Sequence, residues 1–476
     1  MGYPFYSLRD WVEFLDKKGD LVQNNEQISI EGDIAAVSWK IAKNDGPAVI
    51  HNNVEDYPGW KVFSDGLTTR ARQLWALNLE ETRAVQVMAD KLEKNEPMKL
   101  EEVDTGPCKE IKIFGDDVDL TKLPIAFTGE FQTTPHITAG ISFIKDPETG
   151  WVNSGIRRYQ VMGKNKLCNL ILPSQHEGII FAKYKDQNKP MPISLVVGAD
   201  PLVYFSCMMP APDQLDEMGY WGIFAGETLK AVRSETNDIL VPATSEIIIE
   251  GEIDLEERKY EGPFPEFPGY YSGFRMCPVI NVKAITMRQD PIYQYMYMGV
   301  PPSEGHNSGA FVYEMELFKQ IKQLVPAVAD VGMISTWAIT AAISINKQAR
   351  LRNPGLEKKL ALAAKSVKAG ALLKNIFIVD DDVDVHNIHE VMWSLSVKFQ
   401  AAKDITVLED MPGIFLDPSE MWVGHGGKYS GHTSVGIFNC TEKPAPYDEG
   451  YRRGLALPPK KYSERIDQNW RKYGFK

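Results

Sequence analysis

Apolar residues near the start of the chain repeat at helical spacing. Ser7 precedes them and lies three residues before Asp10, while Gly19 follows the last of them. The apolar residues on the common face are Leu8, Trp11, Val12 and Leu15. This pattern predicts an amphipathic helix that is capped at its start by Ser7, ends at Gly19 and buries one face in a core.

The hydrophobic pattern changes twice further along the chain. Helices are predicted at 70–79 and 82–92, and from 111 to about 300 short β-rich runs alternate with turns of Gly, Pro and Asp. After a predicted loop at 301–309 the pattern becomes αβ in character. The elements expected there are a helix at 311–324, one buried strand or core helix at 331–345, a helical stretch at 356–373, a strand at 376–379 and a short terminal helix near 463–473.

These changes predict a multidomain protein of mixed α/β and α+β class. We expect four parts: an N-terminal domain at 1–108, a β-rich central domain at 109–308, an α/β domain at 309–441, and a tail with a helix at 442–476.

Composition narrows the class of protein. A hydrophobic fraction of 43% is ordinary for a folded protein, and a net charge of -12 offers no basic surplus for nucleic acid. The five cysteines are scattered and form no CxxC pair, which favours a reducing, cytoplasmic location. We find no signal-peptide pattern, and the run at 331–345 is shorter than the ~20 residues that cross a bilayer.

An arginine and two glutamates stand in unusual surroundings. Arg158 is the last residue of the run NSGIRR, and Glu261 and Glu266 are the first and last residues of the proline-rich turn EGPFPE. An arginine can clamp a carboxylate or keep a neighbouring glutamate ionised, and burial raises the pKa of a carboxyl group. Stiff, bent segments position side chains, so the pattern favours acid–base chemistry over a solvated turn, although the sequence leaves both open.

A mixed set of ligand types suggests a metal site. Asn153, His176 and Glu217 offer an amide oxygen, an imidazole and a carboxylate, which suit Mn²⁺ or Mg²⁺. Spacing alone also allows all three to be structural. A rival acidic segment at 380–391 lacks the glycine and the final glutamate of a calcium loop, so a strand followed by a helix-capping turn is the better interpretation.

Several motifs in a fixed order resemble those of the UbiD family, the decarboxylases and carboxylases that use prenylated flavin mononucleotide. They extend over nearly the whole chain and include NSGIRRYQVMGKNKL, PSQHEG, VVGADP, PAPDQLDE, VPATSEIIIEGEI, EGPFPE, FIVDDDVD and GHGGK. The resemblance implies a central split β-barrel that binds the flavin, between an N-terminal α/β domain and a C-terminal α/β oligomerisation domain. It also implies a homo-oligomer, from dimer to hexamer.

The resemblance assigns roles to individual residues. Asn153, His176 and Glu217 would hold Mn²⁺ or Mg²⁺ against the flavin phosphate, with Ser206 and Met209 beside a K⁺ ion. The residues expected to contact the flavin are Ile156, Arg157, Arg158, Asn169, Leu170, Ile171, Gln175, His176 and Lys428. Many relatives carry an aromatic residue in place of Arg157.

The implied activity is reversible, non-oxidative decarboxylation of an aromatic or α,β-unsaturated acid, with CO2 as the second partner and a flavin prenyltransferase as the supplier of the cofactor. Arg158 would orient the carboxylate, while Glu261 and Glu266 would assist protonation, with Glu266 as the acid. His306, in the loop at 301–309, is the expected substrate-facing residue. An FMN oxidoreductase and a non-catalytic flavin-binding scaffold are the alternatives; no dinucleotide fingerprint supports the first.

Overall fold

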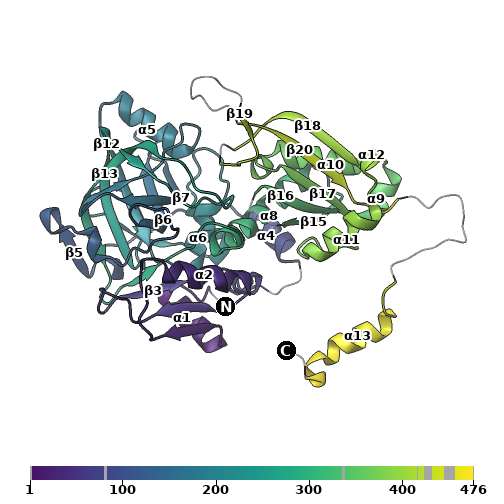
Figure 1. Ribbon diagram of the computed structural model, residues 1–476, viewed down its shortest axis with the longest axis horizontal. Helices are drawn as coiled ribbons and strands as arrows, with labels where there is room; N and C mark the ends of the chain where they lie inside the picture. Colours follow the sequence, from purple (N-terminus) through teal and green to yellow (C-terminus); the bar gives the residue numbers. More distant parts are fainter. Residues whose placement is uncertain are drawn as a thin grey trace, which may run out of the picture.

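The computed structural model describes residues 3–79, 83–334, 338–414, 416–422, 431–443 and 456–474. Figure 1 shows an N-terminal unit beneath a central barrel, with a separate C-terminal sheet beside them. The predicted first helix is confirmed as α1 (Leu8–Lys18). Ser7 accepts a hydrogen bond from the amide of Asp10, and Gly19 ends the helix with a φ of 71°.

The N-terminal unit is a four-stranded sheet with helices on it, in the strand order β1-β2-β3-β14. Its elements are β1 (Leu21–Asn24), α2 (Asp33–Lys43), β2 (Ala48–His51), β3 (Lys61–Ser64), α3 (Arg70–Ala76) and β14 (Ile292–Gln294). α4 (Ala84–Lys94) follows in sequence but packs mainly against the helix Glu304–Leu324. β14 follows the barrel in sequence yet pairs in parallel with β3. The chain therefore returns from the barrel to complete the first sheet, which fastens the two units together.

The predicted split barrel is confirmed. Six antiparallel strands close on themselves in the order β12-β9-β6-β7-β8-β13, and β5 extends the sheet beyond β13. The strands are β5 (Ile111–Phe114), β6 (His136–Lys145), β7 (Val152–Val161), β8 (Lys166–Cys168), β9 (Met191–Val197), β12 (Ile247–Glu261) and β13 (Arg275–Met287). Closure buries one face of every strand and leaves few exposed edges.

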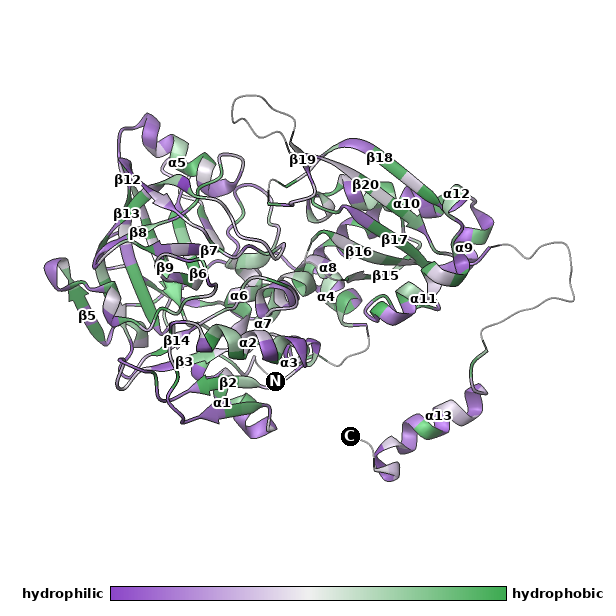
Figure 2. Cartoon of the chain, viewed as in Figure 1, coloured by the Kyte–Doolittle hydropathy of each residue, from purple (hydrophilic) through white to green (hydrophobic). Residues whose placement is uncertain are grey.

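Short helices and a small sheet surround the barrel. They are α5 (His176–Asp186), α6 (Pro201–Met208) and α7 (Gly219–Ala225), with β4 (Glu101–Glu102), β10 (Lys230–Arg233) and β11 (Leu240–Pro242). α6 is buried along nearly its whole length, and Figure 2 shows it in the interior between the barrel and the N-terminal helices.

Helix α8 (Glu304–Leu324) begins earlier than the sequence predicts. The segment 301–309 was expected to be a loop, but Ser303 caps a helix that starts at Glu304. Gly305 is a poor helix former, yet it packs so closely that an added Cβ would lie 2.6 Å from Met298 Cε. Tertiary packing thus overrides local propensity. The first half of α8 lies in the core shared with the barrel, and the second half lies in the C-terminal core.

The C-terminal unit is a mixed sheet in the order β15-β16-β17-β20-β18, with β19 beside β20. Its elements are β15 (Val328–Met333), β16 (Thr340–Ile345), α9 (Lys347–Arg352), α10 (Leu356–Ser366), β17 (Asn375–Asp380), α11 (Ile388–Lys398), α12 (Ala401–Asp404), β18 (Ile405–Pro412), β19 (Met421–Trp422) and β20 (Gly431–Asn439). The prediction of one element at 331–345 is wrong, because β15 and β16 pair as antiparallel strands. An apolar run carries no signal for a reversal within it.

The acidic segment after β17 has a structural role. Asp380 pairs with Arg350 at 2.8 Å, and Asn387 caps α11. The terminal helix α13 (Lys460–Asn469) buries no residue and is predominantly hydrophilic (Figure 2). All five cysteines are free and buried. Among the described residues, no helix has the length and apolar character needed to cross a membrane.

Candidate active site

Strand β7 carries both candidate groups of functional residues. Side chains alternate along a strand, so Arg157 and Arg158 point to opposite faces of the sheet. Arg157 donates a hydrogen bond of 3.1 Å to Asn153 Oδ1, which lies on its own face, whereas Arg158 contacts Glu261 and Glu266. One strand thus serves two separate sites.

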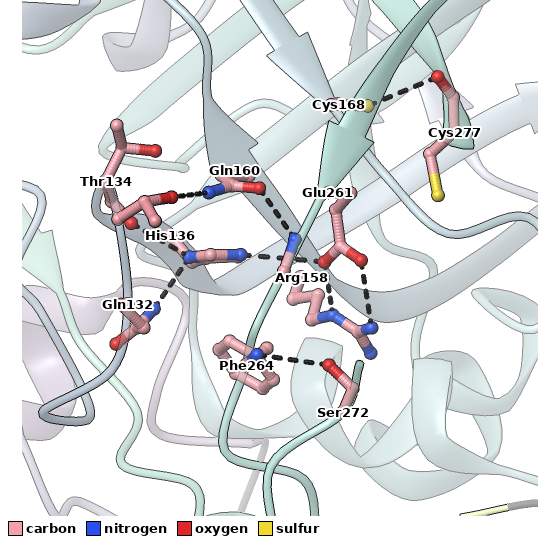
Figure 3. Close-up of polar contacts among 12 residues, drawn as sticks. Gln132, Thr134, His136, Arg158, Gln160, Cys168, Glu261, Phe264, Ser272 and Cys277 are labelled. Carbon is pink, nitrogen blue, oxygen red and sulfur yellow. Dashed lines mark hydrogen bonds and ion pairs between the residues drawn. The ribbon is translucent and has the colours of Figure 1, made fainter. Parts of the chain in front are cut away.

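Arg158 is held between two buried carboxylates. Its Nε donates to Glu261 Oε1 at 2.7 Å, and its Nη2 donates to Glu261 Oε2 at 3.2 Å, which makes a bidentate pair (Figure 3). Nη1 lies 2.7 Å from Glu266 Oε1, so the same guanidinium also pairs with the second glutamate. Glu266 is therefore held to Arg158 by one contact, whereas Glu261 is held by two.

The two glutamates hold opposite protonation tendencies. Burial raises the pKa of Glu261, but the nearby His136 ring and the charge of Arg158 outweigh it and bring that pKa to about 2. Burial raises the pKa of Glu266, and the Glu261 charge raises it further, against the opposing charge of Arg158. When the pKa values of two neighbouring carboxyl groups move apart in this way, the one with the lowered pKa, Glu261, stays ionised and the other, Glu266, can act as an acid.

The turn that carries Glu266 is braced on both sides. The amide of Gly262 donates to Gln160 Oε1 at 2.9 Å, and a Cβ there would lie 2.7 Å from the oxygen of Gly273, so the close approach requires glycine. The amide of Phe264 donates to Ser272 Oγ at 3.0 Å (Figure 3). The stiffness that the prolines suggest is thus supplied by hydrogen bonds as well.

His306 lies behind this turn. It is buried, its Nε2 is 2.6 Å from the carbonyl oxygen of Phe267, and its Nδ1 is 2.6 Å from Ser303 Oγ. Both ring nitrogens are therefore engaged, and the ring ties the start of α8 to the residue after Glu266. Its expected role facing the substrate stays a prediction, and nothing in this geometry turns the ring toward a cavity.

Asn153, His176 and Glu217 come together although they are far apart in sequence. Asn153 Nδ2 lies 2.7 Å from Glu217 Oε1 and 3.4 Å from His176 Nδ1, and Glu217 Oε1 lies 3.7 Å from the same ring nitrogen. Asn153 Oδ1 accepts the hydrogen bond from Arg157, so metal binding through this oxygen would replace that hydrogen bond and give the mixed O/N set that Mn²⁺ or Mg²⁺ accepts. Within the described ranges, no group of three or more His, Cys, Asp or Glu residues offers another metal site.

These three residues line a cavity of about 440 Å³, a size typical of ligand pockets. Ile156, Arg157 and Gln175, which are predicted to contact the flavin, also line it, as does Met209, which is predicted to lie beside K⁺. The remaining described residues of the wall are Ser154, Gly155, Ser174, Cys207, Met208, Pro210, Ala211, Met296, Met298, Gly305, Gly309, Tyr313 and Lys368.

The other predicted residues are not among the described residues of the cavity wall. Ser206 is fully buried, and its hydroxyl has no hydrogen-bond partner among the described residues. Asn169 is buried and donates to Glu177, while Leu170 and Ile171 are half-buried. Lys428 lies outside the described residues.

Sequence reasoning missed three residues of these sites. Glu177 pairs with Arg157 at 2.7 Å, Lys368 reaches the cavity from the C-terminal unit, and His136 lies behind Glu261. Glu177 is next to His176 and could have been found from the motif PSQHEG. Lys368 and His136 stand in ordinary helical and strand patterns, so no signal in one sequence distinguishes them.

Three family models match the chain, and together they cover most of it. They describe the N-terminal domain (residues 12–92), the Rift-related domain (100–301) and the C-terminal domain (306–430) of 3-octaprenyl-4-hydroxybenzoate carboxy-lyase. A curated relative, pyrrole-2-carboxylic acid decarboxylase of Pseudomonas aeruginosa, is 28% identical over 98% of both chains.

Solved structures agree with the sequence comparison. The UbiD-class enzyme HmfF from Pelotomaculum thermopropionicum, solved with FMN, has a TM-score of 0.84 at 28% identity and covers 97% of this chain and 99% of its own. Vanillic acid decarboxylase of Sedimentibacter hydroxybenzoicus in its open form has a TM-score of 0.86 at 28% identity, over 98% and 99% of the two chains. The predicted family is confirmed: the chain belongs to the UbiD family of carboxy-lyases.

Proposed function

We propose that this protein catalyses the reversible, non-oxidative decarboxylation of an aromatic carboxylic acid with the help of prenylated FMN. The observation that carries the proposal is the Arg158 guanidinium between Glu261 and Glu266, whose pKa values move in opposite directions. An ionised carboxylate, a fixed cation and a carboxylic acid are the groups that carboxylate binding and carbon protonation need.

The 440 Å³ cavity supplies a fitting environment for the cofactor phosphate and its metal. Asn153, His176 and Glu217 would hold Mn²⁺ or Mg²⁺. Met209 of the cavity wall and Ser206, whose buried hydroxyl has no hydrogen-bond partner among the described residues, would adjoin K⁺. α5 begins at His176, and the amides at a helix N-terminus favour anions. Arg157 and Lys368 would add positive charge, together with Lys428 as predicted from the family motif.

The chain's own residues divide the reaction between them. When bound, prenylated FMN supplies an electron sink for the pair left on carbon as CO2 departs. The guanidinium of Arg158 orients the substrate carboxylate, and Glu261 keeps that guanidinium in place through two hydrogen bonds. Glu266 gives its proton to the carbon that has lost CO2 and recovers one from solvent before the next turnover. In carboxylation the same carboxylate accepts the proton.

The methionines of the cavity wall suit a flat ring system such as that of a flavin, because thioether sulfur packs well on ring edges. Met209, Met296 and Met298 lie there together with Tyr313. Relatives named for pyrrole-2-carboxylic acid and vanillic acid define the first compounds to test. The alternatives, an FMN oxidoreductase or a non-catalytic scaffold, do not account for the arginine with two differently poised glutamates.

We further propose a homo-oligomer that assembles through the C-terminal unit. α11 exposes four apolar side chains, and β18 exposes two more: Ile388, Met392, Trp393, Val397, Ile405 and Val407. Exposed apolar patches of this kind mark contact surfaces. Light scattering of the wild type and of a W393E/V397E variant tests this, and an unchanged mass between the two would contradict it.

The activity is tested by co-expression with a flavin prenyltransferase, followed by incubation with pyrrole-2-carboxylate, vanillate and related acids. We expect CO2 release and exchange of ¹³C-bicarbonate into the acid, only in protein that carries the prenylated flavin by mass. Protein made without the prenyltransferase is the matched control. A prenylated holoenzyme that neither releases nor exchanges CO2 with any acid, or one that oxidises a nicotinamide instead, would contradict the proposal.

A further inference from the structure

His136 lies directly behind the Arg158–Glu261 pair. It is the first residue of β6, it is fully buried, and its Nε2 is 3.5 Å from Glu261 Oε1 (Figure 3). No described residue makes a hydrogen bond of ordinary length to this nitrogen. A buried ring N–H has to face an acceptor, and Glu261 is the acceptor it faces.

The hydrogen bonds of Gln132 determine which ring nitrogen carries the proton. Gln132 Oε1 accepts from the amides of Thr128 at 2.6 Å and Gly129 at 2.7 Å, so its NH₂ group must be the end that lies 2.6 Å from His136 Nδ1. An amide NH₂ only donates, so Nδ1 accepts and the proton of the neutral ring sits on Nε2. Burial also lowers the pKa of His136, which opposes a second proton on Nδ1 despite the Thr134 carbonyl at 3.2 Å.

We propose that His136 is a positioning residue for the reaction: Gln132 fixes its tautomer, and its Nε2–H holds the Glu261 carboxylate ionised and aligned with Arg158. A separation of 3.5 Å is long for a hydrogen bond, and such contacts in free enzymes tighten when the substrate complex forms. The catalytic consequence rests on the proposed function, whereas the orientation of the ring does not.

The surroundings of Glu261 make its contact with His136 important for its ionisation. Glu261 is fully buried, so it depends on a small set of neighbours for its charge. Phe264 packs on the His136 ring at 4.9 Å and on the Arg158 guanidinium at 5.0 Å, so one aromatic side chain aligns both groups (Figure 3). The titratable and charged groups near Glu261 are Arg158, His136, Glu266, Cys168 and, as its cross-strand partner, Arg275.

A first experiment needs neither flavin nor turnover. The chain has eight histidines, so ¹⁵N labelling of the imidazoles and a difference spectrum with H136Q identifies His136. We expect the neutral Nε2–H tautomer at neutral pH, and a changed Nε2 shift in E261Q. A ring that titrates near its ordinary pKa, or one protonated on Nδ1, overturns the proposal whether or not the enzyme decarboxylates anything.

A second experiment separates positioning from packing. Glutamine places its amide nitrogen near the former Nε2, whereas asparagine places its own near Nδ1. We expect H136N to lower kcat by up to ~100-fold and to move the acidic limb of the kcat–pH profile upward, because Glu261 then protonates at higher pH. H136Q should retain more activity than H136N, and the acidic limb of its kcat–pH profile should stay where it is in the wild type.

H51N is the matched control, since His51 is a buried histidine of β2, remote from the catalytic arginine. It should lower Tm without moving the acidic limb. Equal losses in H136Q and H136N with unmoved limbs show a merely structural role and overturn the proposal. If the H136N variant does not fold, the ¹⁵N imidazole spectrum of the wild type still shows whether His136 is the neutral Nε2–H tautomer that the proposal requires. A wild type without decarboxylase activity contradicts the proposed function alone.

Discussion

The ammonium group of Lys368 lies 3.5 Å from Nε2 of the His176 ring, although the lysine belongs to the C-terminal unit and the histidine to the barrel unit. Lys368 also donates to the carbonyl of Ala211. This contact closes the cavity at the junction of two units. A cation at this position would attract an anionic cofactor.

Replacement of Lys368 by alanine should weaken FMN binding. Charge-assisted hydrogen bonds contribute ~1.5–3 kcal/mol, so Kd should rise about 10- to 100-fold. Fluorescence titration of the apoprotein with FMN measures it. K358A, which removes an exposed lysine of α10, should leave Kd unchanged. Equal Kd values for K368A and the wild type would mean that this lysine does not meet the cofactor.

Replacement of Glu266 by glutamine should remove turnover while leaving the flavin bound. The variant cannot donate a proton to carbon, and loss of general acid catalysis costs ~10²–10⁴-fold in rate. The measurement is kcat together with flavin content per chain. E256Q alters an exposed glutamate of the same β12–β13 hairpin and should keep full activity. Substantial turnover by E266Q would assign the acid to another residue.

Replacement of Glu217 by glutamine should remove the divalent metal. The amide has no charge to offset a cation, and Glu217 Oε1 lies at the centre of the predicted ligand set. Asp213 contacts the far side of the His176 ring at 2.9 Å, and loss of such an outer partner typically costs ~10–100-fold in metal affinity. Elemental analysis after dialysis should therefore find the most divalent metal per chain in the wild type, less in D213N and least in E217Q. The reverse order would rule out Glu217 as a ligand.

Stability should decline at alkaline pH through His386. Burial lowers the pKa of His386, but Glu314 and Asp330 outweigh it and raise that pKa to about 9. The protonated ring pairs with these carboxylates in the folded state only. Its contribution to the free energy of unfolding is therefore complete below the ordinary pKa of 6.5 and is lost as pH rises through 9.

The difference in unfolding free energy between the wild type and H386Q should be on the order of 1–3 kcal/mol at pH 6 and should shrink toward pH 10. Urea unfolding at both pH values measures it, and the subtraction removes the effects of other titrating groups. A difference that is constant with pH would show that His386 is not charged in the folded protein.

Local patterns in the sequence were sufficient for several elements. The stripe after Ser7 predicts α1, because capping and helical periodicity involve neighbours within four residues. The ordered motifs identify the family and the residues Arg158, Glu261 and Glu266. Their grouping into one site, however, was an expectation from the resemblance and not from spacing.

Tertiary structure decided what depends on distant contacts. Ser303 caps a helix in what looked like a loop, and this helix is buried from its first turn onward. Residues 331–345 divide into paired strands. His136 and Lys368 acquire their significance only when Glu261 and His176 are brought beside them. Sequence patterns record periodicity and turn chemistry, whereas the protonation state of a buried glutamate depends on groups that the fold assembles from remote parts of the chain.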